Sequence, residues 1–142
     1  AGPERELVDE YMKRAGPIAR SLGFRGIEEI EVASGGGLDA EADRILANLP
    51  SGAKCIRLDE FGRAHRSRDF AGNLAKWRDQ GVPELVFLIG GAEGYGDAVK
   101  SAVPETLAFG PQTWPHRFVR VMLSEQVYRA VSILAGTPYH KD

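Results

Sequence analysis

Cysteine is nearly absent from the sequence, with a single residue of this type, Cys55, in a chain of 142 residues. One thiol cannot form an intramolecular disulfide, so the fold must be stabilised by a packed core instead of covalent cross-links. A chain of this length can bury a core of that kind. We therefore expect Cys55 to be a buried core thiol and the protein to be cytoplasmic, because the cytoplasm keeps thiols reduced.

Long hydrophobic runs and an excess of charge of one sign are missing as well. No apolar stretch approaches the roughly 20 residues needed to cross a bilayer, which predicts a protein without a membrane partner. The formal net charge of -2 gives no overall attraction for nucleic acid, so any RNA contact must use local basic clusters. Two such clusters are Arg57, Arg63, His65, Arg66 and Arg68, and His116, Arg117, Arg120 and Arg129.

Several motifs that mark common chemistries do not occur. The sequence contains no GxxxxGK[ST], HExxH, CxxC or GxSxG. The three histidines, His65, His116 and His140, are far apart and lack the spacing of metal ligands, so we expect no metal site. Glycines at 90, 91 and 94 give GGxxG and not GxGxxG, which argues against a dinucleotide cofactor.

Apolar periodicity predicts helices and short strands in alternation. Helices are expected over residues 3–23, 38–49, 67–80, 96–102 and 117–135, and strands over 27–32, 53–59, 84–90 and 106–110. The alternation predicts one α/β domain over residues 1–142, with a mostly parallel sheet flanked by helices. The unbroken apolar run 84–90 is typical of a central strand buried on both faces, whereas three glutamates place 27–32 at the periphery.

Two helices of this set allow more detailed predictions. Ser67 is suited to cap the start of the helix over 67–80. In the last helix, apolar residues between Phe118 and Leu134 spread around most of the circumference. A helix that is apolar on more than one face is buried on more than one side, so we expect a two-fold homodimer.

Two loops follow predicted strands and are expected to open at the same edge of the sheet. Ligands of open parallel sheets collect beyond the carboxyl ends of the strands, and the loops 90–94 and 109–114 lie at two such ends. Glycine lets backbone approach a ligand closely, but a tight turn at positive φ explains the first loop equally well. Trp114 in the second loop belongs either to a pocket or to the core.

Four blocks of the sequence resemble one known family. They are "LDEFGR" (58–63), "LIGGAEG" (88–94), "WPHRFVRVMLSEQVYRA" (114–130) and "ILAGTPYHKD" at the end of the chain. Together they are similar to the RlmH family of SPOUT-class methyltransferases, which act on a pseudouridine of bacterial large-subunit ribosomal RNA. The resemblance covers nearly the whole chain and implies a SPOUT fold with a C-terminal trefoil knot, a homodimer, S-adenosylmethionine as cofactor and the assembled ribosome as partner.

The resemblance also assigns roles to individual residues. Cofactor contacts are expected at Leu58, Gly90, Phe109, Gly110, Pro111, Gln112, Thr113 and Trp114. Contacts to the substrate RNA are expected at His116, Arg120, Tyr139 and Lys141. The C-terminal tail, residues 139–142, is expected to reach the pocket of the partner subunit.

The implied reaction is an in-line displacement at the sulfonium methyl by N3 of the pseudouridine, which carries an imino proton. Arg129 and His140 are candidates to stabilise negative charge on the ring. Glu125 is either a general base or an ion-pair partner of Arg129 at spacing i, i+4, and both roles stay open.

Two features depart from the family pattern. Family members begin with a strand before the first helix, whereas this sequence starts at Ala1 and proceeds almost directly to a helix. Either that strand is missing here or the sheet has one strand fewer. Tyr95 stands where the family commonly has an aliphatic residue, which puts the local pocket shape in question. Two other functions fit the same sequence: methylation of transfer RNA or of another ribosomal position, and a non-catalytic dimeric RNA-binding or ribosome-assembly module.

Overall fold

Helices and strands alternate along the chain in the computed structural model, which describes residues 2–32, 38–90 and 94–140. The helices are α1 (Pro3–Leu22), α2 (Leu38–Asn48), α3 (Ser67–Asp79), α4 (Asp97–Ala102) and α5 (His116–Ala135). The strands are β1 (Gly26–Glu31), β2 (Lys54–Leu58), β3 (Glu84–Ile89) and β4 (Thr106–Leu107). The predicted α/β alternation is confirmed, with most boundaries shifted by one or two residues.

The four strands form one parallel sheet in the order β1-β3-β2-β4. Strand β3 is paired on both sides, with Leu88 opposite Ile30 of β1 and opposite Arg57 of β2. Strand β1, which carries the glutamates, is an edge strand. The expectations of a central apolar strand and a peripheral acidic one are therefore both confirmed.

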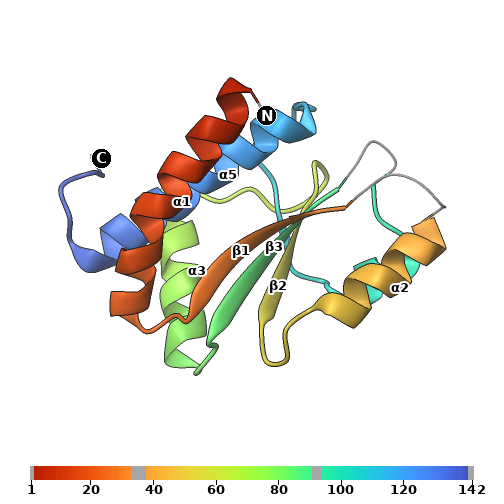
Figure 1. Cartoon of the computed structure of the whole chain (residues 1–142), viewed down its shortest axis with the longest axis horizontal. Helices are drawn as coiled ribbons and strands as arrows, with labels where there is room; N and C mark the ends of the chain where they lie inside the picture. The colour runs from red at the N-terminus through yellow and green to blue at the C-terminus, as the bar shows by residue number, and fades with distance from the viewer. Residues whose placement is uncertain (1, 33–37, 91–93, 141–142) are drawn as a thin grey trace.

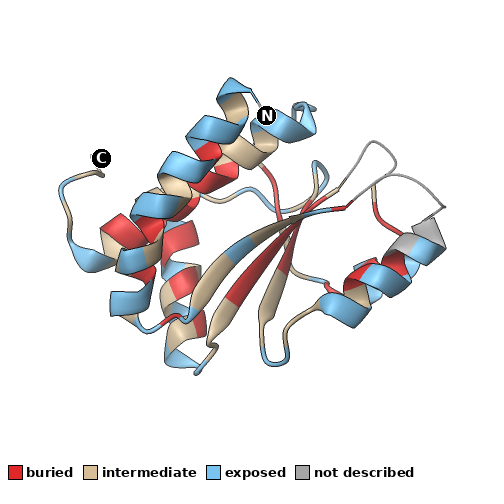
Figure 2. Cartoon of the chain, in the orientation of Figure 1, coloured by how far each residue is buried: buried red, intermediate tan, exposed pale blue. Residues whose placement is uncertain are grey.

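Helices cover both faces of the sheet (Figure 1). Helices α1, α3 and α5 lie on one face, and α2 lies on the other, where it contacts α4. Successive side chains of a strand point to opposite faces of the sheet. Leu85 and Phe87 of β3 therefore enter a first core, under α1, α3 and α5, and Val86 and Leu88 enter a second core, under α2 and α4. Buried residues accordingly run along the sheet and the helix faces turned toward it (Figure 2).

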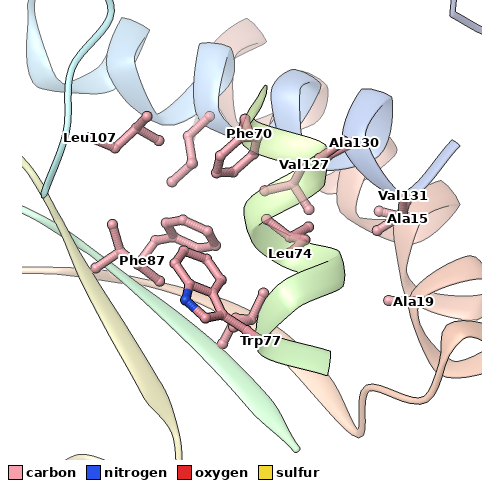
Figure 3. Packing of buried hydrophobic residues seen from close by; sticks show 14 of the residues in the cluster. Ala15, Ala19, Phe70, Leu74, Trp77, Phe87, Leu107, Val127, Ala130 and Val131 are labelled. Atoms are coloured by element: carbon pink, nitrogen blue, oxygen red, sulfur yellow. The ribbon is translucent and has the colours of Figure 1, made fainter. Parts of the chain in front are cut away.

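The larger core is built around Phe87 of the central strand. Its ring packs against Phe70 of α3 at a centroid distance of 5.9 Å, and Leu74 and Trp77 extend the same face of α3 (Figure 3). Val127 of α5 joins this cluster from the next helix. The i, i+4, i+7 spacing seen in the sequence of α3 thus marks the residues that hold it on the sheet.

Helix α5 packs against other helices of its own chain. It contacts both α1 and α3, which lie beside it in Figure 1. The apolar surface that led us to expect a dimer is therefore largely used inside one chain. Trp114 and Phe118, at the N-terminal end of α5, remain 41% and 45% exposed, and the homodimer stays a prediction.

Two local expectations were wrong. Ser67 does not cap α3: its hydroxyl donates to Oε1 of Gln126 at 2.7 Å, and Arg66 precedes the helix without a side-chain cap. The hydrogen bond to α5 competes with the local capping bond and ties the two helices together. Cys55 is half-buried and not fully buried, because it lies at the margin of the second core.

Candidate active site

A cavity opens at the carboxyl ends of three adjacent strands. Strand β2 ends at Leu58, β3 is followed by Gly90, and β4 is followed by Ala108, and all three residues line the cavity. Its volume is about 550 Å³. Because β2 lies between β3 and β4 in the sheet, the three strand ends meet at one edge. The pocket that the sheet-edge argument predicted is present there.

Most residues assigned to the cofactor line this cavity. They are Leu58, Gly90, Phe109, Gly110, Gln112, Thr113 and Trp114. Pro111 is exposed in the same segment but is not among the lining residues. His116, assigned to RNA, also lines the cavity, at the start of α5.

The loop 109–114 is held in shape by its own polar groups. The indole Nε1 of Trp114 donates to the carbonyl of Phe109 at 3.1 Å, and the hydroxyl of Thr113 donates to the carboxylate of Glu60. Gly110 has a φ of 86°, a conformation that few other residues adopt. Trp114 therefore belongs to the wall of the pocket and not to the core.

The glycines after β3 serve two different purposes. Gly94 has a φ of 74°, as a tight turn requires. Gly90 does not have a positive φ; a Cβ there would lie 3.0 Å from Cζ of Tyr95. The absent side chain at position 90 therefore makes room for the Tyr95 ring beside the pocket, and Gly91 lies outside the described residues.

A second polar cluster joins α5 to the tail. Nη2 of Arg129 lies 2.6 Å from Oε2 of Glu125, and the hydroxyl of Tyr139 donates to the same oxygen at 2.7 Å. Nη1 of Arg129 lies 3.5 Å from Nδ1 of His140. The ring of Tyr139 packs against Tyr128 with the ring centroids 4.3 Å apart, and the guanidinium of Arg129 lies over it at 5.1 Å from its centre. The i, i+4 ion pair of Glu125 with Arg129 is thus present. Together with Tyr139 and His140 these residues hold the tail against α5, and we call the four residues the clamp.

Protonation in this cluster follows from its contacts. Burial, together with the hydrogen bond to Glu125, raises the pKa of Tyr139 above its ordinary value. The hydrogen bond to Glu125 is also the main cause of the raised pKa of Arg129. Tyr139 therefore stays a neutral donor and Arg129 stays a cation throughout the physiological pH range.

The clamp does not meet the cavity within one chain. None of Glu125, Arg129, Tyr139 and His140 lines the cavity, whereas His116 does. An α-helix rises about 1.5 Å per residue, so Arg129 lies roughly 20 Å along α5 from His116. The residues assigned to the cofactor and those assigned to catalysis therefore form two separate groups on the chain.

Comparison with known proteins identifies the family. The family described as "Predicted SPOUT methyltransferase" matches residues 1–140. The chain belongs to this SPOUT methyltransferase family. It is 62% identical over 140 residues to the ribosomal RNA large subunit methyltransferase H of Hyphomonas neptunium, covering 99% of this chain and 91% of that protein. Proteins of the same name from Phenylobacterium zucineum and Dinoroseobacter shibae are 54% and 48% identical, each over 99% of this chain and over 91% and 92% of their own lengths.

Several residues of this SPOUT pocket were not assigned from the sequence. They are Asp59, Glu60, Phe61, Ile89, Gly94, Tyr95, Lys100, Leu107, Ala108, Pro115 and Val119. Residues 59–61 directly follow β2, so the sheet-edge argument applied to that strand would have found them. Lys100 and Val119 come from helices, and no local pattern marks them as neighbours of the strand ends.

The remaining substrate candidates differ in their surroundings. Nη1 of Arg120 lies 2.8 Å from Oε1 of Glu31, and its Nε lies 3.3 Å from Oε1 of Glu29. Part of its charge is therefore neutralised by β1. Lys141 lies outside the described residues. Within residues 2–32, 38–90 and 94–140, no group of His, Cys, Asp or Glu is arranged to hold a metal ion. No helix in that part of the chain is long and apolar enough to span a membrane.

Glu29 behind Arg120 gives a prediction for stability. Its side chain is only 3% exposed, and burial raises its pKa despite the hydrogen bond from Ser124 and the charge of Arg120. The folded chain therefore binds this proton more tightly than the unfolded chain, and stability is lost as pH rises from the ordinary glutamate pKa through the folded value. We expect Glu29→Gln to match or exceed the wild-type melting temperature at pH 7, with an advantage that disappears in acid. A variant that is less stable than wild type at pH 7 and equal to it in acid would contradict the claim that ionised Glu29 destabilises the folded chain.

Proposed function

We propose that this chain is an S-adenosylmethionine-dependent methyltransferase that modifies N3 of a pseudouridine in 23S ribosomal RNA on the assembled ribosome. Membership of the SPOUT family and relatives named as large-subunit ribosomal RNA methyltransferases support the proposal. The observation that carries it is the cavity of about 550 Å³ at three strand ends, lined by residues that the family resemblance assigned to the cofactor. A volume of this size suits a nucleoside-sized ligand.

The residues of the cavity fit this cofactor chemically. Leu58, Phe109 and Trp114 offer apolar surface to an adenine ring, and Gly110 brings backbone close to it. Glu60 lines the same cavity and suits a ligand that carries a positive sulfonium, whereas the charge of Asp59 is already paired with Arg57. When bound, S-adenosylmethionine would supply the methyl group to a ring nitrogen and leave as S-adenosylhomocysteine. The protein then has two tasks. It has to align that nitrogen with the bond between the methyl group and sulfur, and it has to help the nitrogen lose its proton.

The clamp on the tail carries the groups that could help the pseudouridine nitrogen lose its proton. Arg129 brings a positive charge that would stabilise an anionic pseudouridine ring, and His140 lies beside it. Glu125 already accepts hydrogen bonds from Arg129 and Tyr139, so its contacts in this chain are those of a positioning residue.

Glu125→Gln separates the two roles of this carboxylate. The variant keeps an oxygen that accepts from Tyr139 but loses the charge that pairs with Arg129. If Glu125 only positions Arg129, we expect a decrease of about tenfold in the methyl-transfer rate, with unchanged pH dependence and cofactor affinity. If it is the base, the rate should fall by at least about a hundredfold and the acidic limb of the pH profile should vanish. A full wild-type rate would exclude both roles.

The distance between clamp and cavity supports a composite site in a homodimer. Arg129 lies roughly 20 Å along α5 from His116, so the tail of one subunit would act in the pocket of the other. The exposed Trp114 and Phe118 lie at the N-terminal end of α5, where a partner would bury them. A single domain over residues 1–142, the trefoil knot and a cytoplasmic location remain predictions of the same account.

Methyl transfer from labelled S-adenosylmethionine tests the proposal against its alternatives. We expect label in ribosomes from cells that lack this protein, and little in protein-free ribosomal RNA or transfer RNA, because the net charge of -2 favours no isolated RNA. Label in transfer RNA alone would favour the other enzymatic function. Failure to bind either S-adenosylmethionine or S-adenosylhomocysteine in calorimetry would favour the non-catalytic module.

A further inference from the structure

Tyr95 is a buried aromatic residue directly beside the cavity. It follows the loop after β3, is 7% exposed, and packs in the second core with Leu88 and Val99. Its ring occupies the space that a side chain at position 90 would need, with Cζ 3.0 Å and the hydroxyl oxygen 3.3 Å from the site of a Cβ. The Tyr95 ring therefore packs directly against the backbone of Gly90.

The hydroxyl of Tyr95 lies between the ends of two neighbouring strands. Its oxygen is 2.8 Å from the carbonyl oxygen of Leu58 in β2 and 2.8 Å from that of Leu88 in β3. A phenol has one proton, so it donates to one carbonyl at a time or shares the proton between them. Burial raises the pKa of this hydroxyl above its ordinary value, so it remains a donor at physiological pH.

Arg57 links the Tyr95 ring to the turn 59–61, which lines another part of the pocket. Its guanidinium lies 5.6 Å from the centre of the Tyr95 ring, and its Nε donates to the carbonyl of Val103 at 2.7 Å. Its Nη1 donates to Oδ2 of Asp59 at 2.8 Å, while Oδ1 of Asp59 accepts from the backbone N–H of Phe61 at 3.0 Å. The turn 59–61 that lines the cavity is thus connected through Arg57 to the face of the Tyr95 ring.

We propose that Tyr95 is a positioning residue of the cofactor pocket, which it shapes by joining the carboxyl ends of β2 and β3. Its hydroxyl fixes the strand end that presents Leu58, and its ring fixes the backbone of Gly90, which directly follows the neighbouring strand β3. An aliphatic side chain could fill the same space but could not donate to either carbonyl. The inference rests on the proposed function, because it concerns the affinity of the same pocket for S-adenosylmethionine.

Tyr95→Phe tests the role of the hydroxyl, since it keeps the ring and removes only the donor. We expect the full-length variant to bind S-adenosylhomocysteine about five- to tenfold more weakly in calorimetry, the range that corresponds to one buried hydrogen bond. The KM for S-adenosylmethionine should rise by a similar factor, while kcat at saturating cofactor should stay within about twofold. In the free protein, the amide resonances of Gly90 and Asp59 should shift.

Ser124→Ala is the matched control, because it removes another buried hydroxyl, which donates to Oε2 of Glu29 at 2.8 Å and does not line the cavity. We expect this control to lose thermal stability and keep wild-type affinity. Wild-type affinity in Tyr95→Phe would overturn the inference, as would an equal loss of affinity in Ser124→Ala. If the wild-type chain itself binds no S-adenosylhomocysteine, the proposed function fails first and the inference fails with it.

Discussion

Gly90→Val is expected to reduce the affinity for S-adenosylhomocysteine by at least about a hundredfold, or roughly 2.7 kcal/mol. A Cβ at this position would lie 3.0 Å from Cζ and 3.2 Å from Cε2 of Tyr95, which is too close for a ring held in a packed core. Either the ring moves toward the cavity or the loop after β3 shifts away from Leu58. Overpacking of this kind costs about 1–3 kcal/mol, so the chain should still fold with a lowered melting temperature.

Gly72→Ala is the matched control for this substitution. Gly72 lies in α3, and a Cβ there would meet no atom within 4 Å. Alanine is favoured over glycine inside a helix by about 1 kcal/mol, so this variant should melt at a higher temperature. Its affinity should equal that of wild type. Tight cofactor binding by Gly90→Val, measured by calorimetry beside this control, would contradict the site described here.

Removal of residues 138–142 is expected to lower the rate of methyl transfer by at least about a hundredfold, while the affinity for S-adenosylhomocysteine stays within about twofold. The deletion takes away Tyr139 and His140, the tail residues of the clamp, but no residue that lines the cavity. It keeps Thr137, whose N–H donates to the carbonyl of Ser132 and closes the end of α5. Parallel single-turnover and calorimetric measurements separate the two effects.

Tyr139→Phe is the milder companion of the deletion. It keeps the ring contact with Tyr128 and loses the hydrogen bond to Glu125, so its rate should fall between those of wild type and the truncated chain. A truncated chain with the wild-type rate would remove the tail from the mechanism. A truncated chain that no longer binds the cofactor would show that the tail belongs to the pocket of its own subunit.

Mixed dimers of the two disabled chains test whether the site is composite. A dimer of Gly90→Val with the truncated chain contains one intact pocket facing one intact tail only if the tail acts across the interface. Random mixing should then restore about a quarter of the wild-type sites, because half of the dimers are mixed and each has one complete site. If pocket and tail act within one chain, mixing restores nothing.

The sequence predicted the features that depend on local patterns and general sheet rules. The apolar run 84–90 became the central strand, and the acidic segment 27–32 became an edge, because burial of a strand is visible in its composition. The pocket followed from the rule that parallel strand ends meet at one edge of the sheet. These inferences needed no knowledge of distant contacts.

Other features depend on contacts between distant parts of the chain, and the sequence could not predict them. Ser67 bonds Gln126 of α5 instead of capping its own helix, and the apolar faces of α5 meet α1 and α3. Tyr95 was unexplained because its two carbonyl partners belong to different strands. The separation of the Glu125 clamp from the cavity likewise depends on the length of α5 and the course of the tail, and on no motif.

The position of the transferred methyl group tests the central claim most directly. Ribosomes from cells that lack this protein would be incubated with the enzyme and labelled S-adenosylmethionine, and the modified nucleoside would be identified by mass spectrometry and mapped by reverse transcription. The account predicts 3-methylpseudouridine at a single position of the large-subunit ribosomal RNA, and no product with Gly90→Val at the same cofactor concentration. A methyl group on another nucleoside, or none in wild-type reactions that bind the cofactor, would contradict it.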